Sequence, residues 1–523
     1  MQKEKIMNIG IAIITMILLI TITQNIYASS FEEKFEWVKQ TFEENDAGVL
    51  HILERRGQVA YEAHNRMILE RIRAAETMDE FLHISRDWLE FFRQGHHNIG
   101  PNPNFGTSDL EQNDEVEEES SVTQVIHYSL DVDIAQFMEY VTTLDDPTSY
   151  EGIWDIGEVY TIGIIRESDS YIGFIIDSVY EEWLPNMIKL RIDTDGNDVV
   201  STFYVRNFTP DVSGKPTKIG NNFMSMGSRN NRDMKRLQPV FQDNVFIENY
   251  LRFISYTEPY FEMINDNTLY FRLPSFPMDT TRLDQIIEGN INRITSTRNL
   301  IIDFRNNGGG RGNLPLFEYL YTNPIVSSLA TDFYATEKNN QVIYNLSQGI
   351  SLMGSVLGVE MGEEVIEILK QHATHMYEQI KDRVGEFVRI DVSPEKFILD
   401  NVYQYPKHVA IITNKDTGSA AEHYTLMAKQ STKVKVFGEP TFGIMDTTFI
   451  GESMVESPCG EIWLQYTNAR FSYVPGMVFD GIGIQPDFFI DSSVPDYRWV
   501  EHVTEIMNSW VTEPETRRRR GRR

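Results

Sequence analysis

Apolar positions recur at helical spacing through the first part of the chain, from residue 31 to about residue 92. Phe31, Phe35, Val38 and Phe42 are four, three and four residues apart, which places them on one helix face. Charged residues interleave with them and glycine is scarce. We therefore predict two to four packed helices within a helical region over 31–105, ended by the Gly- and Pro-containing stretch GHHNIGPNPNFGTS.

The pattern changes to short β-branched and aromatic runs separated by turn residues over 122–268, as in YTIGIIRES and YIGFIIDSVY. This predicts a β-rich module. Its segment DTDGND has the carboxylates of a calcium loop. However, the glycine stands at position four rather than six, and Tyr204 occupies the place of the chelating glutamate. We therefore expect a hairpin turn there.

Strands and helices alternate from residue 269 onward. NLIIDF and HVAIIT predict buried strands, while TRLDQIIEGNINRITS and GSAAEHYTLMAKQ predict helices. Such alternation is typical of an α/β fold. We predict a catalytic core over 269–495 with a helical insertion at about 340–400, followed by a C-terminal helix and a basic tail over 496–523.

The N-terminal segment indicates where in or outside the cell the protein is located. Lys3 and Lys5 precede an uncharged apolar run from Ile6 to about Ile22, and small residues follow, as in a secretory signal peptide over 1–28. An uncleaved membrane anchor is the alternative, because the run is close to the shortest length that spans a bilayer. Either way we expect most of the chain outside the cytoplasm, secreted or attached to the surface of a bacterium.

Composition limits the partners. A formal net charge of −30 argues against a nucleic-acid binder, and the acidic stretch 106–121 predicts a solvated linker. The one cysteine, Cys459, can form no internal disulfide and is expected to be structural. His372 and His375 share a predicted helix face without a carboxylate partner, so we expect a solvated face rather than a metal site. No metal and no cofactor are predicted.

Ser419 is the first candidate for chemistry. It lies where the strand HVAIIT hands over to the helix that begins GSAAEHY. A serine at such a place is most often only a helix cap. Here Gly418, Ala420 and Ala421 leave room for a substrate, and the helix N-terminus offers N–H donors to a developing oxyanion. Open α/β sheets also carry their sites at this edge. We therefore predict Ser419 as a nucleophile.

The glycines of LIIDFRNNGGG end a buried strand and free backbone N–H groups to approach an anion or oxyanion. They match neither the phosphate-loop pattern nor the dinucleotide-binding pattern. Taken alone they are equally consistent with a plain tight loop.

Five motifs, LPSF, NLIIDFRNNGGG, HVAIITNKDTGSAAEHYTLMAKQ, VFGEPTFG and GIGIQPDFFID, occur in the order and spacing of the C-terminal processing, or tail-specific, serine peptidase family. The chain resembles that family over about 269–490. The family includes tricorn-type peptidases and the retinoid-binding repeats of the interphotoreceptor protein. The resemblance implies a crotonase-like/ClpP-like α/β core, hydrolysis of peptide bonds, and a protein or peptide substrate.

The resemblance also implies roles for particular residues. Ser419 stands at the position of the family's nucleophile. The amide of Ala420, together with one amide from Gly308, Gly309 or Gly310, stands where the family has its oxyanion hole. Family members often carry a PDZ-like module, whose carboxylate-binding loop we do not find before residue 269. The β-rich module is therefore expected to be a family-specific module that covers the active site.

Many family members pair the serine with a lysine directly after TFG. Here that position is Ile444, 25 residues beyond Ser419 (444 − 419), and it cannot accept a proton. The tricorn-type branch instead uses a histidine from the N-terminal region, oriented by a late carboxylate. FFRQGHHNIG resembles that histidine turn and puts His96 in the position of the base. Asp480 occupies the place of the tricorn-type glutamate, and Asp446 is a second candidate.

Other assignments stay open at this point. His96 could be a loop histidine without a catalytic role, and His423, one helical turn beyond Ser419, is expected to be structural. The leading interpretation is a secreted serine endopeptidase, with no nucleic acid as partner and a membrane only through an uncleaved N-terminal segment. The alternative is a non-catalytic binding protein on the same fold. An esterase is less favoured, because no G-x-S-x-G motif is present.

Overall fold

The computed structural model describes residues 30–510 except 103–128, 158, 196–197, 207, 209, 214, 227–232, 256–257, 278–279, 311–313, 350–362, 391–395, 452–453 and 475. The predicted signal peptide, acidic linker and basic tail lie outside the described residues. The chain divides into two compact units. The first comprises residues 1–113, 258–494 and 500–523, and the second comprises 114–257 and 495–499.

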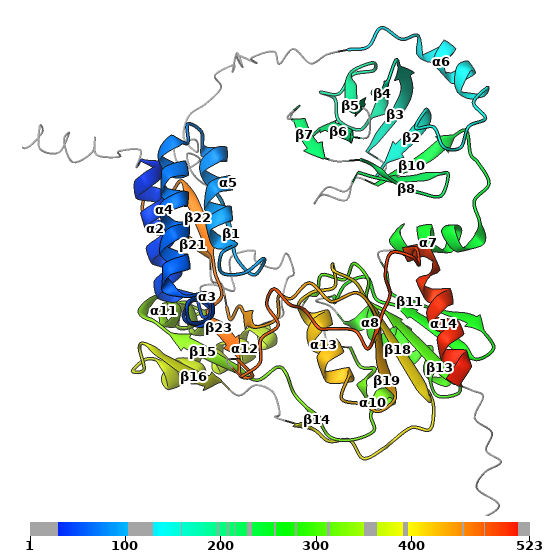
Figure 1. Ribbon diagram of the computed structural model, residues 1–523. Coiled ribbons are helices and arrows are strands. Elements are labelled where there is room, and N and C mark those ends of the chain that lie inside the picture. Colours follow the sequence, from blue (N-terminus) through cyan, green and yellow to red (C-terminus); the bar gives the residue numbers. More distant parts are fainter. Residues whose placement is uncertain are drawn as a thin grey trace, which may run out of the picture. The chain divides into compact units, whose positions relative to one another are not determined.

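From residue 30 to residue 102 the described part of the first unit contains four helices, as the apolar spacing predicts (Figure 1). They are α2 (Phe31–Asn45), α3 (Val49–Arg56), α4 (Gln58–Ala74) and α5 (Met78–Leu89). Capping boxes at Ser30 and Thr77 start α2 and α5. Their apolar faces pack with strand β22 (Ile462–Gln465), because β1 (Asn98–Pro101) pairs with it. The N-terminal helices therefore share a core with the C-terminal part of the chain.

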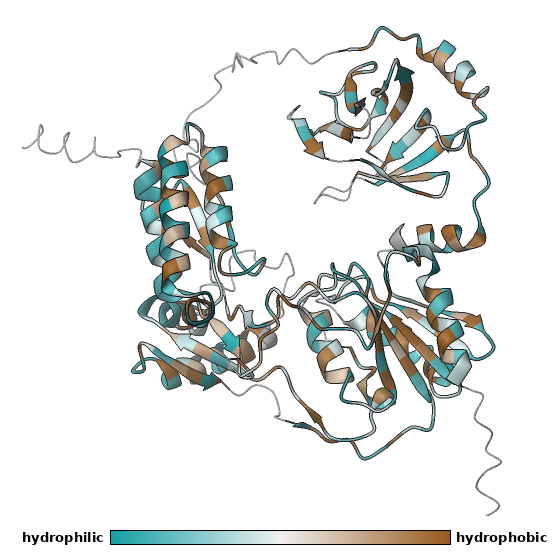
Figure 2. Cartoon of the chain, in the orientation of Figure 1, coloured by the Kyte–Doolittle hydropathy of each residue, from teal (hydrophilic) through white to brown (hydrophobic). Residues whose placement is uncertain are grey.

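A six-stranded sheet forms the centre of the predicted catalytic core, in the order β11-β12-β13-β18-β19-β24. β11 is antiparallel to β12 and the remaining neighbours are parallel. The strands are β11 (Tyr260–Asn265), β12 (Thr268–Arg272), β13 (Asn299–Asp303), β18 (His408–Thr413), β19 (Val434–Gly438) and β24 (Phe488–Phe489). The two central strands, β13 and β18, are almost entirely buried. The middle residues of both are apolar (Figure 2), as expected of parallel strands covered on both faces.

Helices of the first unit surround this sheet: α8 (Thr281–Glu288), α9 (Ile291–Ile294), α10 (Phe317–Leu320), α13 (Ala420–Ala428) and α14 (Trp499–Ser509). Leu283 and Ile287 of α8 join Tyr424 and Ala428 of α13 in one cluster with the strands. The fold is therefore α/β, with N-terminal helices and a separate β-rich module.

Three smaller sheets complete the first unit. β16-β15-β23-β20 comprises β15 (Thr331–Ala335), β16 (Glu386–Ile390), β20 (Thr447–Thr448) and β23 (Ala469–Phe471), and β1-β22-β21 adds β21 (Met454–Glu456). β14 (Ile325–Val326) pairs with β17 (Lys396–Phe397). The predicted helical insertion contains α11 (Glu337–Ser347) and α12 (Glu363–Ile380), yet β16 and β17 also fall within it. Residues of β16 that continue the helical pattern pair with β15 instead.

The second unit holds a nine-stranded sheet in the order β7-β6-β5-β4-β3-β2-β10-β9-β8. Its elements are α6 (Ile134–Val141), β2 (Gly152–Ile156), β3 (Tyr160–Glu167), β4 (Ser170–Ser178), β5 (Ile188–Asp195), β6 (Asp198–Tyr204), β7 (Pro210–Ser213), β8 (Thr217–Ile219), β9 (Phe223–Ser225), β10 (Asp233–Gln238), α7 (Val245–Ser255) and the 3-10 helix η1 (Asp496–Arg498).

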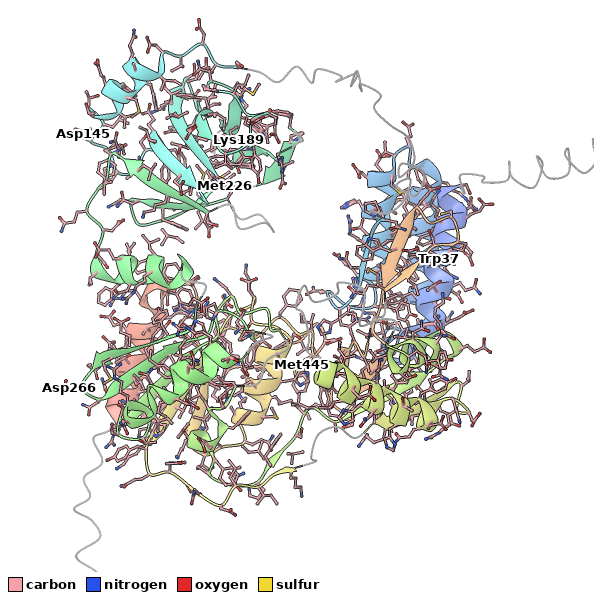
Figure 3. The ribbon with its side chains drawn as sticks, turned by 180° about the vertical axis from the view of Figure 1, so that it is seen from behind. Trp37, Asp145, Lys189, Met226, Asp266 and Met445 are labelled. Atoms are coloured by element: carbon pink, nitrogen blue, oxygen red, sulfur yellow. The ribbon has the colours of Figure 1, made fainter. Side chains whose placement is uncertain are left out.

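β5 and β6 pair in antiparallel register up to Asp195 and Asp198, on either side of the predicted hairpin turn. The turn residues themselves, 196–197, lie outside the described residues. Lys189 lies among the side chains of this unit (Figure 3), its Nζ 3.6 Å from the ring centroid of Trp183 and 3.8 Å from that of Tyr160. Within the part of the chain that the structure describes, no helix is long and apolar enough to cross a membrane.

Candidate active site

Ser419 occupies a sharp turn between β18 and α13. Its backbone has φ 52° and ψ −117°, in the left-handed half of the map that residues other than glycine rarely adopt. Such strain is kept where the surrounding structure holds it, and it clusters at functional sites. The amide of Gly418 donates to the carbonyl of Asn307 at 2.9 Å, which ties the turn to the loop after β13. Two adjacent parallel strands thus present Ser419 at their carboxyl ends.

The glycine loop lies directly against this turn. A Cβ on Gly309 would come within 2.6 Å of the Cβ of Ser419, and a Cβ on Gly310 would come within 1.9 Å of the carbonyl oxygen of Phe276. Both glycines also have positive φ, 103° and 135°. Only glycine therefore permits this close approach.

The predicted oxyanion donors differ in their surroundings. The amide of Gly309 already donates to Oδ1 of Asn307 at 2.9 Å. Gly310 and Ala420 line the same pocket as Ser419. Among the described residues, the Ala420 amide at the first position of α13 has no hydrogen-bond acceptor. Ala420 and Gly310 are thus better placed than Gly308 or Gly309 to receive an oxyanion.

Glu422 fixes the turn from within α13. Its buried carboxylate accepts from the amide of Ser419 at 2.9 Å and from the amides of Gly443 and Ile444 at 2.8 and 3.0 Å. The hydroxyl of Thr441 donates to it at 2.5 Å. Burial raises the pKa of Glu422, and these four hydrogen bonds oppose the rise. One carboxylate therefore joins the nucleophile turn to the loop that follows β19.

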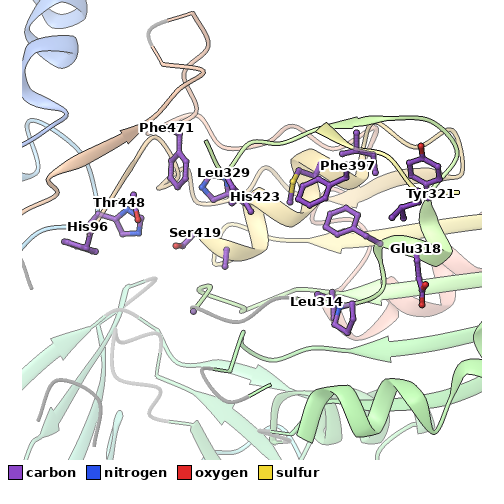
Figure 4. Close-up of a pocket in the computed structure, with 18 residues that line it drawn as sticks. His96, Leu314, Glu318, Tyr321, Leu329, Phe397, Ser419, His423, Thr448 and Phe471 are labelled. Carbon is purple, nitrogen blue, oxygen red and sulfur yellow. The ribbon is translucent and has the colours of Figure 1, made fainter. Parts of the chain in front are cut away.

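His96 lines the same pocket as Ser419, and Figure 4 shows it beside Thr448 at one end of that pocket. Its Nδ1 lies 2.8 Å from the carbonyl oxygen of Thr447. A carbonyl can only accept, so Nδ1 carries the proton and Nε2 keeps its lone pair. Among the described residues no hydrogen bond joins His96 to Ser419. Such contacts are often long until a substrate binds.

Burial, together with the neighbouring charge of Arg93, lowers the pKa of His96 to about 4. The side chain is therefore neutral at physiological pH, as a proton acceptor must be. His96 also has positive φ, 57°, like Ser419. Both candidate residues thus sit in strained backbone that their surroundings hold in place.

A buried ion pair holds the turn that carries His96. Nη1 and Nη2 of Arg93 donate to Oδ1 and Oδ2 of Asp46 at 2.8 and 2.5 Å. The same guanidinium donates to the carbonyls of Gly95 and His96 at 3.0 and 3.1 Å. His97 turns away and its Nε2 donates to the carbonyl of Arg93 at 2.7 Å. Arg93 therefore holds this turn in place, and the imidazole of His97 stabilises the backbone of the same turn.

The carboxylate of Asp480 and that of Asp446 each accept hydrogen bonds from backbone amides of the other residue and of its preceding neighbour. Oδ1 of Asp480 accepts from the amides of Met445 and Asp446 at 2.8 and 2.9 Å. Asp446 accepts from the amides of Phe479 and Asp480. Burial and the charge of Asp480 raise the pKa of Asp446 to about 7. Within the described residues neither carboxylate is hydrogen-bonded to His96, so the predicted orienting contact is not present. The pair instead fixes the segment that leads to Thr447.

Ile444 occupies the position at which many members of the family that the chain resembles have a lysine. A Cβ on Gly95 would lie 3.0 Å from its Cγ2, and a Cβ on Gly418 would lie 3.2 Å from its Cδ1. The isoleucine therefore packs between the histidine turn and the serine turn. A branched apolar side chain stands where the lysine amine would be, and it supplies contact rather than a base.

The surroundings of the remaining candidate residues indicate structural rather than catalytic roles. His423 is buried, its Nδ1 lies 3.0 Å from Oγ of Ser328, and burial lowers its pKa to about 3. His375 contacts Gln379 on an exposed helix face, and Cys459 lies 3.2 Å from Oγ of Ser457. Among the described residues no group of three or more His, Cys, Asp or Glu could hold a metal ion.

The pocket at Ser419 has a volume of about 980 Å³, at the upper end of the range for ligand pockets. It is lined by His96, Gly310, Leu314, Pro315, Phe317, Glu318, Tyr321, Ile325, Leu329, Phe397, Leu399, Ser419, Ala420, His423, Met427, Thr448, Phe449 and Phe471. Most of the lining side chains are apolar; His96, Thr448 and His423 lie near Ser419, while Glu318 and Tyr321 lie at the other end of the pocket (Figure 4). Such a pocket suits a peptide better than a small ion.

Three supporting residues were not among the sequence-predicted candidates. Glu422 follows Ser419 by three residues, and S-x-x-E is the capping-box pattern, so a signal for it was present. Asp46 and Arg93 are 47 residues apart with no motif between them. Their pairing depends on how α2 and α5 pack, and the sequence pattern holds no sign of it.

Residues 267–490 match the model of peptidase family S41. No curated protein matches the sequence. Among solved structures, mature CPAF complexed with lactacystin is 12% identical, over 92% of this chain and 98% of that one, with a TM-score of 0.48.

Two further structures are similar. The photosystem II D1 C-terminal processing protease is 12% identical over 92% of this chain and 97% of that one, with a TM-score of 0.35. The tricorn protease is 14% identical over 92% and 36%, with a TM-score of 0.33. The family match spans the parallel strands and the loops that carry Ser419. This chain is therefore a serine-type peptidase, a hydrolase.

Proposed function

We propose that this serine-type peptidase is an extracytoplasmic endopeptidase of the Ser–His type, secreted or held at the cell surface. The observation that carries the proposal is that His96 and Ser419 line one pocket while Nδ1 of His96 faces a carbonyl. This leaves Nε2 as the nitrogen able to take a proton. Ile444 leaves no lysine at the family position to compete for that role.

In the proposed reaction Oγ of Ser419 attacks the peptide carbonyl carbon while Nε2 of His96 takes the hydroxyl proton. The oxyanion is received by the amides of Ala420 and Gly310. The C–N bond then breaks as His96 returns the proton to the leaving amine. Water hydrolyses the resulting ester of Ser419 by the same steps, and the free serine is restored.

The orientation of His96 is proposed to come from the carbonyl of Thr447. Asp480 and Asp446 act through the backbone, because their hydrogen bonds fix residues 445 and 446 next to that carbonyl. Arg93 and Asp46 hold the histidine turn from the other side. Asp480 is thus a positioning residue rather than a direct partner of the imidazole.

The fall of kcat/KM at acidic pH tests the assignment of His96 as the general base. Since the pKa of His96 is lowered to about 4, the base stays neutral well below pH 6.5. We expect kcat/KM on a peptide to fall with a midpoint near pH 4 to 5, whereas an unperturbed histidine would give a midpoint near 6.5. A limb centred at 6.5 or above would contradict the assignment.

The pH profile needs a stability control. The pKa of His96 and of His97 is lowered to about 4, so the unfolded chain binds more protons than the folded one between pH 6.5 and 4. Their contribution to stability is therefore lost as the pH falls through that window. Asp446, whose pKa is raised to about 7, acts in the opposite sense below pH 7. Thermal melts at each pH separate unfolding from titration of the base.

Glu422→Gln is expected to damage the nucleophile turn. A glutamine has one acceptor oxygen, so its NH₂ group would face two of the four donors that the carboxylate satisfies. Unsatisfied buried donors cost about 1–3 kcal/mol each. We expect a lower melting temperature and at least a tenfold slower phosphonylation of Ser419. Glu36→Gln, at an exposed glutamate of α2, is the matched control. Equal labelling rates in both variants would refute the role.

A non-catalytic binding protein is the second candidate, favoured by the replacement of the family lysine by Ile444. A fluorophosphonate probe distinguishes the two. Covalent labelling of Ser419 supports the peptidase, because phosphonylation needs an activated hydroxyl. Tight peptide binding by a chain that is never labelled supports the binding protein. Secretion is tested by the N-terminal mass of protein recovered from culture medium.

A further inference from the structure

The pocket extends well beyond the nucleophile. Ser419, at the N-cap of α13, lines it together with Ala420, His423 and Met427 from one face of that helix. These residues span eight positions, or about 12 Å at 1.5 Å per residue. Figure 4 shows Phe397 and Tyr321 at the end of the pocket away from His96. An extended peptide advances about 3.3 Å per residue, so about four residues reach that end from the scissile bond.

The wall at the far end continues onto the surface. Phe397 and Leu399 line the pocket, while Ile398 between them is 70% exposed. Val402, farther along the same segment, is 59% exposed, and Val326, paired with Lys396 across β14 and β17, is 53% exposed. We call Val326, Ile398 and Val402 the apolar strip. Exposed apolar side chains that gather next to a pocket mark a binding surface.

We propose that the apolar strip is a docking surface for unfolded polypeptide substrates, which receives their apolar residues about four or more positions from the scissile bond. The inference rests on the proposed peptidase function and names the substrate class of that site: chains in extended conformation with exposed apolar side chains. Ile398 directly precedes Leu399 and Val326 directly follows Ile325, and both Leu399 and Ile325 line the pocket, so one extended substrate would reach both. A short peptide ends inside the pocket and never reaches the strip.

The test is a length-dependent effect of a charge on the strip. In the full chain, the double variant Ile398→Asp, Val402→Asp is compared with wild type on a three-residue reporter and on a twelve-residue peptide with apolar flanks around the same cleavage site. We expect kcat/KM on the long peptide to fall at least tenfold and kcat/KM on the reporter to stay within twofold. Val59→Asp, at an 81% exposed position of α4, is the matched control and should change neither.

A loss on both substrates, or on neither, would overturn the proposal. Binding in a Ser419→Ala background separates it from the chemistry, because anisotropy of a labelled twelve-residue peptide needs no turnover. There the strip variant should bind at least tenfold more weakly. If the wild-type protein neither cleaves peptides nor reacts with the fluorophosphonate probe, the proposed peptidase function is wrong. The binding measurement alone then decides whether the apolar strip is a docking surface. A variant that turns a dimer into a monomer in sedimentation, with peptide binding unchanged, would identify the strip as a self-interface and overturn the proposal.

Discussion

Ser419→Ala is expected to abolish peptide hydrolysis, with a loss of about 10⁶ in kcat, the size seen when a serine peptidase loses its nucleophile. The physical reason is local. Ser419 is the hydroxyl placed at the carboxyl ends of the parallel strands, beside the free amide of Ala420 and the glycine loop. Cleavage of an unstructured protein, followed by mass spectrometry with both chains prepared identically, measures the loss.

The control for Ser419→Ala uses the strain at this position. Alanine at φ 52° is as strained as serine, so Ser419→Ala should melt close to wild type. Ser419→Gly relieves the strain and should melt at the same or a higher temperature, yet be equally inactive. Activity that survives in both folded variants would mean that another residue attacks the substrate.

His96→Ala is expected to lower kcat by about 10⁴ to 10⁶, with the residual rate supplied by the oxyanion donors and by substrate binding. Removing the imidazole leaves Ser419 without a proton acceptor, since Ile444 cannot replace it. The rate of reaction with a fluorophosphonate should fall in parallel, because it depends on the same activated hydroxyl.

His97→Ala is the matched control for His96→Ala. Its imidazole donates to the carbonyl of Arg93 and lies outside the pocket-lining set. We therefore expect some loss of thermal stability and activity within tenfold of wild type. If the two alanine variants lose activity equally, the effect belongs to the turn held by Arg93 and Asp46 rather than to the base.

Local patterns predicted the parts of the site that depend on local structure. The strand ends at Asp303 and Thr413 follow from apolar runs bounded by glycine and turn residues, and they put the glycine loop and Ser419 at one edge of the sheet. Cβ contacts explain the glycines directly, since neither Gly309 nor Gly310 tolerates a side chain. Each of these features depends on a few consecutive residues, so a local sequence pattern can predict it.

The partner of His96 could not be predicted in the same way. Thr447 contributes a carbonyl, and every residue has one, so no side-chain pattern singles it out. The resemblance pointed to a carboxylate at Asp480, whose hydrogen bonds in the structure go to backbone amides. Likewise, the pairing of β1 with β22 joins residues more than 360 positions apart, which periodicity cannot show. β16 was missed because its apolar residues suit either a helix or a strand.

The central claim is that Ser419 is activated by His96 in a chain that lacks the family's lysine. The most direct measurement is the rate at which a fluorophosphonate modifies the protein, with the modified residue located by peptide mass mapping, in wild type and in His96→Ala. The account predicts modification at Ser419 in wild type and a rate at least a thousandfold slower in His96→Ala. Labelling at another residue, or equal rates in the two proteins, would contradict it.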